Sequence, residues 1–206
     1  FGNGIFFGDM NAIQCATSVD GDTWVELSHP SFSSTCSPWF GGGTFIFTHG
    51  SSAAAMATVN GLTFTESSTP SADVSSSGGC YGGGVHIAYG GAGACYSLDN
   101  GQTWAVATVP LSWALPNSVV YGKGRFIAFG VGGSITNLYH YSTDGRTWTQ
   151  GTLPASRNWR SVIHADGVFL GCSRDAVGSS GVLITSTNGM DWGLSPNPFV
   201  LNRGFT

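Results

Sequence analysis

The feature that most constrains the fold is a short motif that occurs five times along the 206 residues. Each copy has a glycine, an aromatic residue three positions later and then a proline. The glycines are Gly21, Gly61, Gly101, Gly145 and Gly189. The aromatic residues are Trp24, Phe64, Trp104, Trp148 and Trp192, and the prolines are Pro30, Pro70, Pro110, Pro154 and Pro198. All three series advance by 40, 40, 44 and 44 residues, and a period of about 40 with strand-like content is typical of blade-type repeats.

A single repeat contains four short strand-like segments separated by turns. In residues 111–154 these segments are expected at 117–121, 125–129, 138–142 and 147–151. Asp144-Gly145 predicts a hairpin turn between the last two, because such turns require positive φ. An aromatic-Gly-x-Gly turn recurs between the first two segments, as FGNG, FGGG, YGGG, YGKG and the variant HADG. Four antiparallel strands per unit, repeated radially, predict a β-propeller.

The two ends of the sequence are predicted to complete one repeat together. The chain begins with a turn that precedes a second strand, and residues 201–206 align with the first strand at 158–163. We therefore expect one all-β domain over residues 1–206, a five-bladed propeller closed by one C-terminal strand joining three N-terminal strands. The blades are 199–206 plus 1–30, 31–70, 71–110, 111–154 and 155–198. An open solenoid would need polar capping repeats, which neither end resembles.

The amino-acid composition limits the kinds of partner that we expect this protein to bind. Only 9% of residues are charged, against about 25% in an ordinary soluble domain, which favours an extracellular or particle-borne protein. The seven Lys and Arg are interpreted as scattered, so no basic patch for nucleic acid is expected. No apolar run is long enough to span a bilayer, so no membrane insertion is expected. No metal or cofactor motif occurs, and the five cysteines are expected to be free thiols, mostly buried. Because the sequence starts at Phe1 in the middle of the pattern, we expect a domain of a larger parent chain.

The hairpins that carry the repeated glycine resemble a known element. Residues 18–24, 97–104 and 142–148 read Ser-x-Asp, then glycine, then Thr-Trp. They resemble the Asp-box, S-x-D-x-G-x-T-W, of sialidase-like propellers, although only residues 97–104 have its full spacing. The resemblance implies a structural role for the turn residue before each glycine, whose side chain accepts bonds from its own turn, and packing of each aromatic residue between blades. These turn residues are Asp20, Asn60, Asp99, Asp144 and Asn188.

The shortened turn also looks like repeats of bacteriophage tail-fibre and other virion-surface proteins. That resemblance implies a host-recognition domain on a virion or another extracellular surface, binding a cell-surface glycan or protein. It would be a homotrimer if borne on a fibre. One alternative is a structural or assembly knob without a small ligand. The other is a divergent sialidase-like glycoside hydrolase.

The sequence does not supply the facing pair of carboxylates that a glycoside hydrolase needs, so we assign no catalytic residue. Sialidases of the resembled type use an arginine triad, a Tyr–Glu pair and an acidic Asp. The only glutamates here are Glu26 and Glu66, which follow motif aromatics and are expected on outermost strands. Paired carboxylates must face one another across the scissile bond, which outer strands of different blades do not allow. A non-enzymatic protein is therefore expected.

A ligand is expected where the repeats differ most, at the connections between blades. The richest stretch is residues 157–160, and we expect Arg160 and Arg203 to point toward the channel mouth from matching innermost strands. Tryptophan stacks on sugar rings, and Arg or Asn binds hydroxyls or carboxylates. The alternative for Trp39 and Trp159 is packing between blades. The candidate ligand-binding residues are Arg157, Asn158, Trp159, Arg160, Asn202, Arg203, Trp113 and Trp39.

Overall fold

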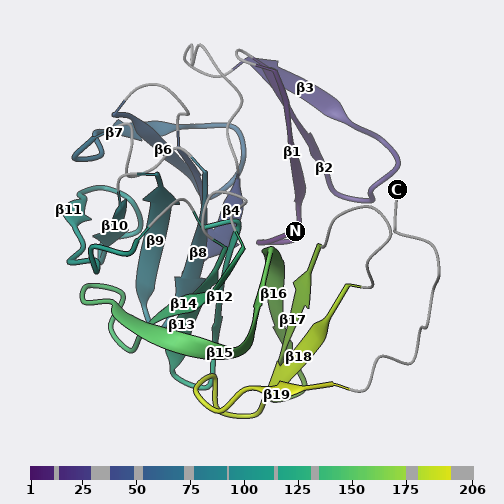
Figure 1. Ribbon diagram of the computed structural model, residues 1–206. Coiled ribbons are helices and arrows are strands. Elements are labelled where there is room, and N and C mark those ends of the chain that lie inside the picture. The colour runs from purple at the N-terminus through teal and green to yellow at the C-terminus, as the bar shows by residue number, and fades with distance from the viewer. Residues whose placement is uncertain are drawn as a thin grey trace. The chain divides into compact units, whose positions relative to one another are not determined.

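The computed structural model shows an all-β chain in the residues that it describes. These are residues 1–11, 14–28, 38–48, 53–71, 77–91, 93–113, 116–130, 135–174 and 181–195. Their strands form five antiparallel sheets, which we call blades 1 to 5 (Figure 1). The chain divides into two compact units, Phe1–Thr108 and Val109–Thr206, so the prediction of a single domain stays a prediction. No helix of the described part is long and apolar enough to cross a membrane.

Unit 1 holds the first three blades, each with its strands hydrogen-bonded in chain order. Blade 1 is β1 (Phe6–Asn11), β2 (Gln14–Ser18) and β3 (Val25–Ser28). Blade 2 is β4 (Trp39–Gly41), β5 (Thr44–Thr48), β6 (Ala55–Thr58) and β7 (Thr65–Ser67). Blade 3 is β8 (Gly78–Gly82), β9 (Val85–Gly90), β10 (Gly93–Ser97) and β11 (Ala105–Val106). The strand predicted to complete blade 1, from residues 199–206, lies outside the described residues.

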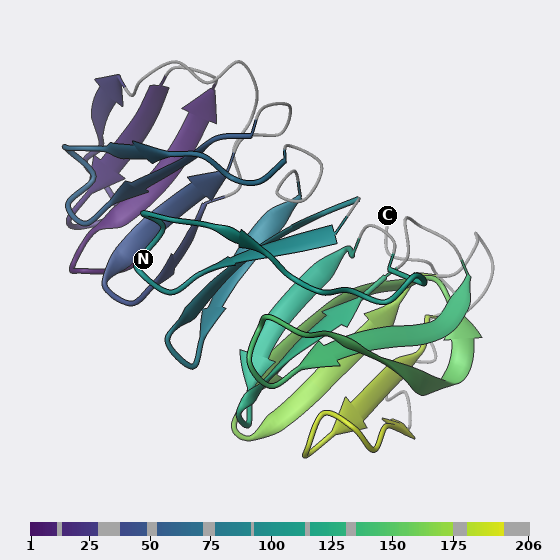
Figure 2. The same ribbon diagram turned by 90° about the vertical axis from the view of Figure 1, so that its left-hand side faces the viewer.

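Unit 2 holds two four-stranded blades. Blade 4 is β12 (Ser118–Gly122), β13 (Arg125–Phe129), β14 (Thr136–Ser142) and β15 (Thr149–Arg157). Blade 5 is β16 (Trp159–Ala165), β17 (Val168–Ser173), β18 (Leu183–Ser186) and β19 (Gly193–Leu194). In Figure 2 the green to yellow colours follow the chain through these two sheets.

The same two-residue turn precedes β1 in blade 1 and joins the first two strands of each of the other four blades. In blade 4, Lys123 and Gly124 have φ of 49° and 75°, and positive φ at both central residues is the geometry that matches the twist of a hairpin. The equivalent pairs of residues with positive φ are 3–4, 42–43, 83–84 and 166–167. The recurring turn of the sequence is therefore confirmed as a fixed structural element, including its variant HADG.

Aromatic rings pack neighbouring blades together within each unit. The Tyr81 ring of blade 3 lies against Gly41 of blade 2, where an added Cβ would be 2.1 Å from the ring. His164 of blade 5 lies in the same way against Gly122 of blade 4, at 2.3 Å. Each of these rings also stacks on an aromatic residue of the next strand, Tyr81 on His86 and His164 on Phe169, with centroids 4.6 Å apart in both pairs. The glycine thus provides the space that the neighbouring blade fills.

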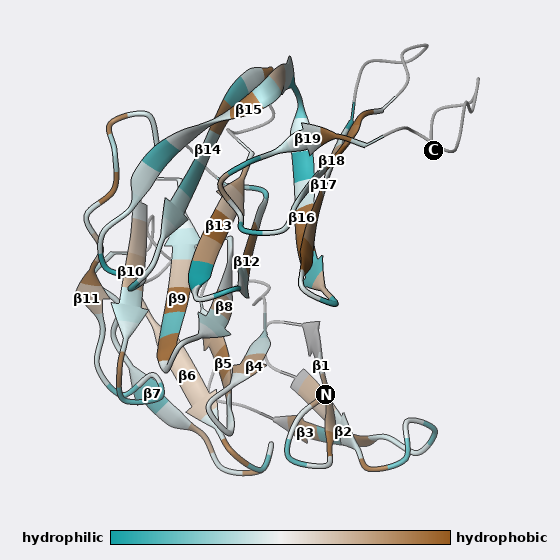
Figure 3. Cartoon of the chain, turned by 90° about the horizontal axis from the view of Figure 1, so that it is seen from below, coloured by the Kyte–Doolittle hydropathy of each residue, from teal (hydrophilic) through white to brown (hydrophobic). Residues whose placement is uncertain are grey.

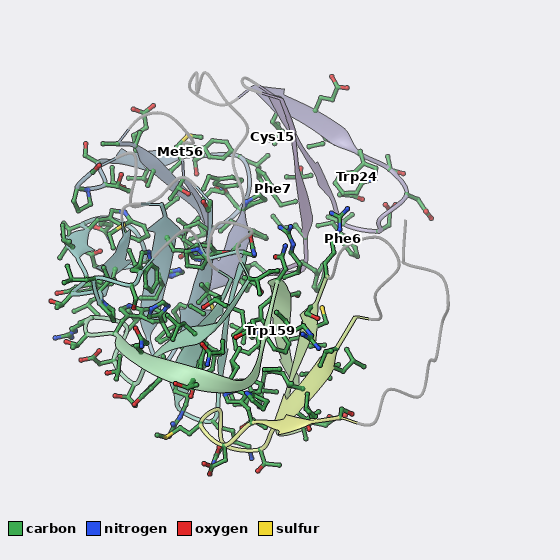
Figure 4. The ribbon with its side chains drawn as sticks, viewed as in Figure 1. Phe6, Phe7, Cys15, Trp24, Met56 and Trp159 are labelled. Atoms are coloured by element: carbon green, nitrogen blue, oxygen red, sulfur yellow. The ribbon has the colours of Figure 1, made fainter. Side chains whose placement is uncertain are left out.

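Each unit has its own apolar core. In unit 1, Phe45, Phe47 and Met56 of blade 2 are buried, and the partly buried Phe7 of blade 1 packs against them. Figure 4 labels Phe7 and Met56. In unit 2 the buried cluster has eight members, Ile127, Phe129, Tyr139, Leu153, Trp159, Val162, Phe169 and Ile184. Figure 3 shows the corresponding contrast within blade 4, whose inner strand β13 is mostly brown and whose outer strand β15 is mostly teal and white.

The four cysteines among the described residues are free thiols, namely Cys15, Cys80, Cys95 and Cys172. Cys15 and Cys95 are buried, whereas Cys80 and Cys172 are partly buried. Burial raises the pKa of Cys95 to about 12, so this thiol remains protonated at neutral pH and behaves as a small apolar side chain. Cys36 lies outside the described residues.

Candidate functional site

The last hairpin of each blade contains a turn that is held by a single polar side chain. In blade 1, Asp20 Oδ1 accepts bonds from the backbone N–H groups of Asp22 and Thr23, at 2.9 and 2.8 Å. The hydroxyl of Ser18 donates to the same carboxylate and accepts from Gly21 N–H. These bonds, led by the one from Thr23, lower the pKa of Asp20 to about 2. The carboxylate is thus occupied by its own turn, as the sequence predicted.

In blades 2 and 5 an asparagine side chain accepts the hydrogen bonds of the turn. Asn60 Oδ1 accepts from the N–H groups of Leu62 and Thr63, and Asn188 Oδ1 accepts from those of Met190 and Asp191. The turns of blades 3 and 4 use Asp99 and Asp144. The prediction that this residue bonds its own turn is confirmed in all five hairpins. The name Asp-box for it stays a resemblance.

The turn aromatics connect adjacent blades within a unit. Trp104 Nε1 donates to Gly101 O of its own turn and to Ser67 Oγ of blade 2. Trp192 of blade 5 stacks on Phe129 of blade 4, with centroids 4.9 Å apart. Trp148 packs on Phe126 of its own blade, with centroids 6.2 Å apart, and Trp24 is 45% exposed (Figure 4). We call this end of each blade the turn end.

The opposite end of the blades in unit 2, which we call the loop end, is less regular. Strand β15 ends there at Arg157 and β16 begins there at Trp159. Trp159 pairs with Ser173 whereas Ser161 pairs with Cys172, so Arg160 is an extra residue in a β-bulge. Bulges occur often beside functional sites because they redirect a side chain.

The bulge brings a further arginine to the loop end. Arg174, the residue that follows β17, donates its backbone N–H to Asn158 O at 2.8 Å. Arg157 pairs with Thr136 at the start of β14, and its Nη1 donates to Ser156 O at 3.1 Å. The backbones of Arg157, Arg160 and Arg174 therefore meet at one corner of unit 2. Sequence reasoning did not select Arg174, although counting strand pairs back from the Asp166-Gly167 turn places it opposite residues 158–159.

Buried side-chain atoms without a hydrogen-bond partner at this corner include Asn158 Oδ1, Trp159 Nε1 and Arg160 Nε. Leaving such an atom unpaired costs about 1–3 kcal/mol, and native proteins account for nearly all of their buried polar atoms. Asn158 and Arg160 are each only partly buried as whole residues, so other atoms of both side chains reach solvent.

The predicted tryptophan platform is not present at this corner. Trp159 is 0% exposed and packs in the core against Phe129, with centroids 5.8 Å apart (Figure 4). Trp113 is also buried, against His140 and Trp148. Neither ring has a free face for a sugar, so the packing alternative describes Trp159, and the ligand role expected of these two side chains is corrected. The reason is that β16 turns Trp159 toward the interior one residue before the bulge.

Three further candidate ligand-binding residues, Trp39, Asn202 and Arg203, do not lie among the described residues of this corner. Trp39 belongs to unit 1, is half-buried, and donates Nε1 to His86 Nδ1 at 3.2 Å. It also meets Trp104 edge-on at 6.4 Å, which is packing between blades 2 and 3. Asn202 and Arg203 lie outside the described residues, so their predicted position at a channel mouth stays a prediction.

Two buried histidines stand out as titratable groups. His86 occupies the position at which the other four blades have Phe6, Phe45, Phe126 and Phe169. His140 is buried beneath Trp113, and its Nε2 lies 3.2 Å from Ser112 Oγ. Loss of hydration lowers the pKa of each to about 4. Both imidazoles are therefore neutral at physiological pH.

Neither histidine is part of a recognisable catalytic or metal group. Ser112 directs its hydroxyl proton to Gln150 Oε1 rather than to His140, which is the reverse of what a serine nucleophile requires. Among the described residues, no three His, Cys, Asp or Glu side chains come together as a metal site. Glu26 and Glu66 are exposed on β3 and β7, the last strands of blades 1 and 2, as the sequence predicted.

Comparison with known proteins identifies the fold. No protein-family model matches the chain, and no curated protein matches it. Among solved structures, virginiamycin B lyase from Staphylococcus aureus is similar over 91% of this chain, with 11% identity and a TM-score of 0.73. YCF48 bound to the D1 peptide is similar over 88%, with 16% identity and a TM-score of 0.61. A catalytically inactive variant of the lyase, solved with quinupristin, is similar over 92% of this chain, with 12% identity and a TM-score of 0.72.

These likenesses define the class of structure. The sheets described above are those of a β-propeller, which confirms the predicted all-β propeller fold, whereas closure of the ring by the C-terminal strand stays a prediction. Identities of 11% to 16% show the fold alone. The chain spans 64% of the length of the lyase and 60% of that of YCF48.

Proposed function

We propose that this protein is a non-enzymatic recognition module that binds its ligand at the loop end of unit 2. The observation that carries the proposal is the contrast between the two ends of the blades. At the turn end, the Asp or Asn before each repeated glycine is bonded to its own turn in every blade, and buried nitrogens without a partner belong to Arg125, His164 and Trp192. At the loop end, a β-bulge places Arg160 beside Arg174, and Asn158 Oδ1 and Arg160 Nε remain unpaired. Irregular connections on a rigid scaffold are where binding residues are usually found.

The proposed ring has five blades, with a fourth strand for blade 1 supplied by residues 199–206. Blade 1 has three described strands where each other blade has four. A C-terminal strand pairing with this sheet would cover an edge that otherwise leaves backbone groups unpaired. In such a ring Arg203 would stand one blade away from Arg160, at the matching position of the innermost strand.

The proposed ligand is a cell-surface glycan or protein, and the proposed location is a virion surface, such as a phage tail fibre, or another extracellular site. The repeat resemblance and the low charge content support this setting, which also implies a larger parent chain and a homotrimer if the parent is a fibre. Propellers similar to this chain were solved with a peptide and with quinupristin, so the fold is compatible with ligands of both kinds.

Two alternatives are kept. A structural or assembly knob would need no ligand, and the extensive bonding of the turn end fits it. A divergent glycoside hydrolase is not favoured, because the two glutamates lie exposed on outer strands and face no partner carboxylate that any described residue supplies.

A binding screen tests the proposal. The folded domain would be applied to a glycan array and to host-cell surfaces beside an Arg160→Ala/Arg203→Ala double variant. We expect the unaltered domain to bind a glycan or a host-cell surface, and the double variant to lose this binding. Binding that survives would move the site elsewhere, and a folded protein that binds nothing would favour the structural knob. A fluorogenic sialoside assay, in which activity is expected to be absent, tests the hydrolase alternative.

A further inference from the structure

The charges of this chain are segregated along its sequence. All seven Lys and Arg lie between residues 123 and 203, within unit 2, and unit 1 has none. The expectation that the cations are scattered is therefore wrong. With histidine neutral, the side chains of unit 1 carry a formal charge of −7, and those of unit 2, with seven cations and four acids, carry +3. The acids of unit 1 are Asp9, Asp20, Asp22, Glu26, Glu66, Asp73 and Asp99.

One residue in the last hairpin of each blade is not needed to hold the turn, and we call it the tip residue. The buried Ser or Thr before it accepts a hydrogen bond from the N–H of the repeated glycine. The Asp or Asn after it accepts hydrogen bonds from its own turn. The tip side chain between these two is exposed in all five blades, so the fold does not dictate its chemistry. The tip residues are Val19, Val59, Leu98, Thr143 and Thr187.

The tip residues differ between the two units. The three of unit 1 are aliphatic, with exposed fractions of 76%, 56% and 53%, whereas both of unit 2 are threonine. The hairpin of blade 2 adds a second exposed aliphatic side chain. Exposed apolar residues are ordinary when they occur singly, but a contiguous group of them marks an interaction site. We call Val19, Val59, Leu62 and Leu98 the aliphatic row of unit 1.

Polar contacts join the turn ends of the three blades of unit 1. Asn3 Nδ2 of blade 1 donates to Gly43 O and Val59 O of blade 2, at 2.7 and 2.8 Å. Gly42 of blade 2 lies beside blade 3, because a Cβ added to it would be 2.6 Å from Asn100 Oδ1. Blade 2 therefore lies between blades 1 and 3 at the turn end, and its part of the aliphatic row is in the middle.

Carboxylates stand on both sides of this apolar centre. Asp20 and Asp22 are in the hairpin of blade 1 and Asp99 is in that of blade 3, whereas residues 58–64 of blade 2 include no acid. The hydrogen bond from Thr23 N–H contributes most to lowering the pKa of Asp20 to about 2, so this carboxylate is charged at neutral pH. An apolar centre with a charged rim is the usual anatomy of a protein interface.

We propose that the turn end of unit 1 is a docking surface for a polypeptide that presents aliphatic side chains between lysines or arginines. Contact with the aliphatic row would provide the affinity. The acids of unit 1, which has no cation of its own, would attract and orient a basic partner. The same charge repels nucleic acids and acidic glycans. This surface belongs to unit 1 and the proposed ligand site belongs to unit 2, so each proposal can fail without the other.

The other blades supply substitutions that the turn tolerates. Val59→Thr/Leu98→Thr introduces the tip residue of blades 4 and 5. Asp20→Asn/Asp99→Asn removes two charges and keeps the oxygen acceptor, since asparagine holds the turn in blades 2 and 5. Thermal unfolding would verify that both double variants remain folded.

Matched controls change the same chemistry elsewhere in unit 1. Val106→Thr alters an aliphatic side chain that is 61% exposed on β11, and Glu66→Gln removes a charge from the exposed face of β7. Three labelled peptides of equal length would be titrated into the full chain and followed by fluorescence anisotropy. Their sequences alternate leucine with lysine, serine with lysine, and leucine with glutamate.

We expect the leucine–lysine peptide alone to bind, with an affinity that falls as salt is raised. The double threonine variant should weaken binding about tenfold or more, because apolar contact is lost. The double asparagine variant should weaken it about threefold or more, and each control should change it less than about twofold.

Four outcomes would overturn the docking surface. They are no binding of the leucine–lysine peptide, equal binding of the serine–lysine peptide, equal binding of the leucine–glutamate peptide, and equal losses in the controls. Sedimentation of the chain without peptide tests for a different occupant. Salt-sensitive self-association that the double threonine variant abolishes would make a second copy of this chain the occupant and end the proposal of a separate basic partner.

Discussion

At the scale of single residues, one polar side chain in the last hairpin of each blade fixes the conformation of its turn. One oxygen of Asp144 accepts from the N–H groups of Arg146 and Thr147, at 2.8 and 2.9 Å. Asp144→Ala removes this acceptor and should lower the free energy of unfolding by about 1–2 kcal/mol. Asp144→Asn should retain most of the stability, because blades 2 and 5 use asparagine at this position. Urea unfolding measures both, and equal losses would show that charge rather than the bond holds the turn.

His86 should make the protein sensitive to mild acid. Burial lowers its pKa from 6.5 to about 4, so the folded state binds a proton less readily than the unfolded chain. Stability is then complete above about pH 6.5 and is lost as the pH falls toward 4, by about 2.5 kcal/mol at pH 4.5 for this one group. His140 adds a loss with the same sign.

Replacing His86 by the residue of the other blades tests that account. His86→Phe should reduce the difference in urea stability between pH 7 and pH 4.5 by about 2 kcal/mol, while His140 preserves the remainder. The variant loses the bond from Trp39 but also removes a buried nitrogen, Nε2, that has no hydrogen-bond partner. An unchanged pH difference would show that His86 is hydrated in solution.

At the scale of elements, contact between blades depends on glycine as much as on aromatic rings. A Cβ at Gly41 would lie 2.1 Å from Tyr81, so Gly41→Ala forces the rings of blade 3 outward. We expect a loss of about 1–3 kcal/mol from this overpacking. Gly193→Ala is the matched control, because a Cβ there meets nothing within 4 Å and its backbone has no positive φ. Thermal unfolding should separate the two, and similar small losses would show that adjacent blades can move apart.

The elements were largely predictable, whereas the orientation of the site residues was not. The strand expected at 125–129 is β13, and the turns around Gly21, Gly145 and their equivalents lie where their spacing placed them. For Trp159 the sequence left ligand binding and packing open as alternatives, because strand alternation alone cannot locate a bulge. The extra residue Arg160 shifts the alternation, so that Trp159 and Val162 are buried while Arg160 and Ser161 are partly exposed. A bulge depends on the partner strand, which a local pattern does not include.

At the scale of the whole molecule, the repeat makes a prediction about closure. If residues 199–206 pair with blade 1, deleting residues 198–206 exposes a sheet edge and the apolar contacts beneath it. The deletion should lower the free energy of unfolding by at least about 2 kcal/mol, and a synthetic peptide of residues 198–206 should restore part of it.

Arg203→Ala separates closure from binding in the same measurement. This variant keeps the backbone of the proposed strand, so its stability should stay within about 0.5 kcal/mol of the parent, although ligand binding falls. The charge segregation makes the comparison informative, because unit 1 has no cation of its own and Arg203 would bring the first positive charge to blade 1. If the deletion leaves the urea midpoint unchanged, the C-terminal segment does not complete the ring. Blade 1 would then stand as a three-stranded sheet with an edge open to a partner strand.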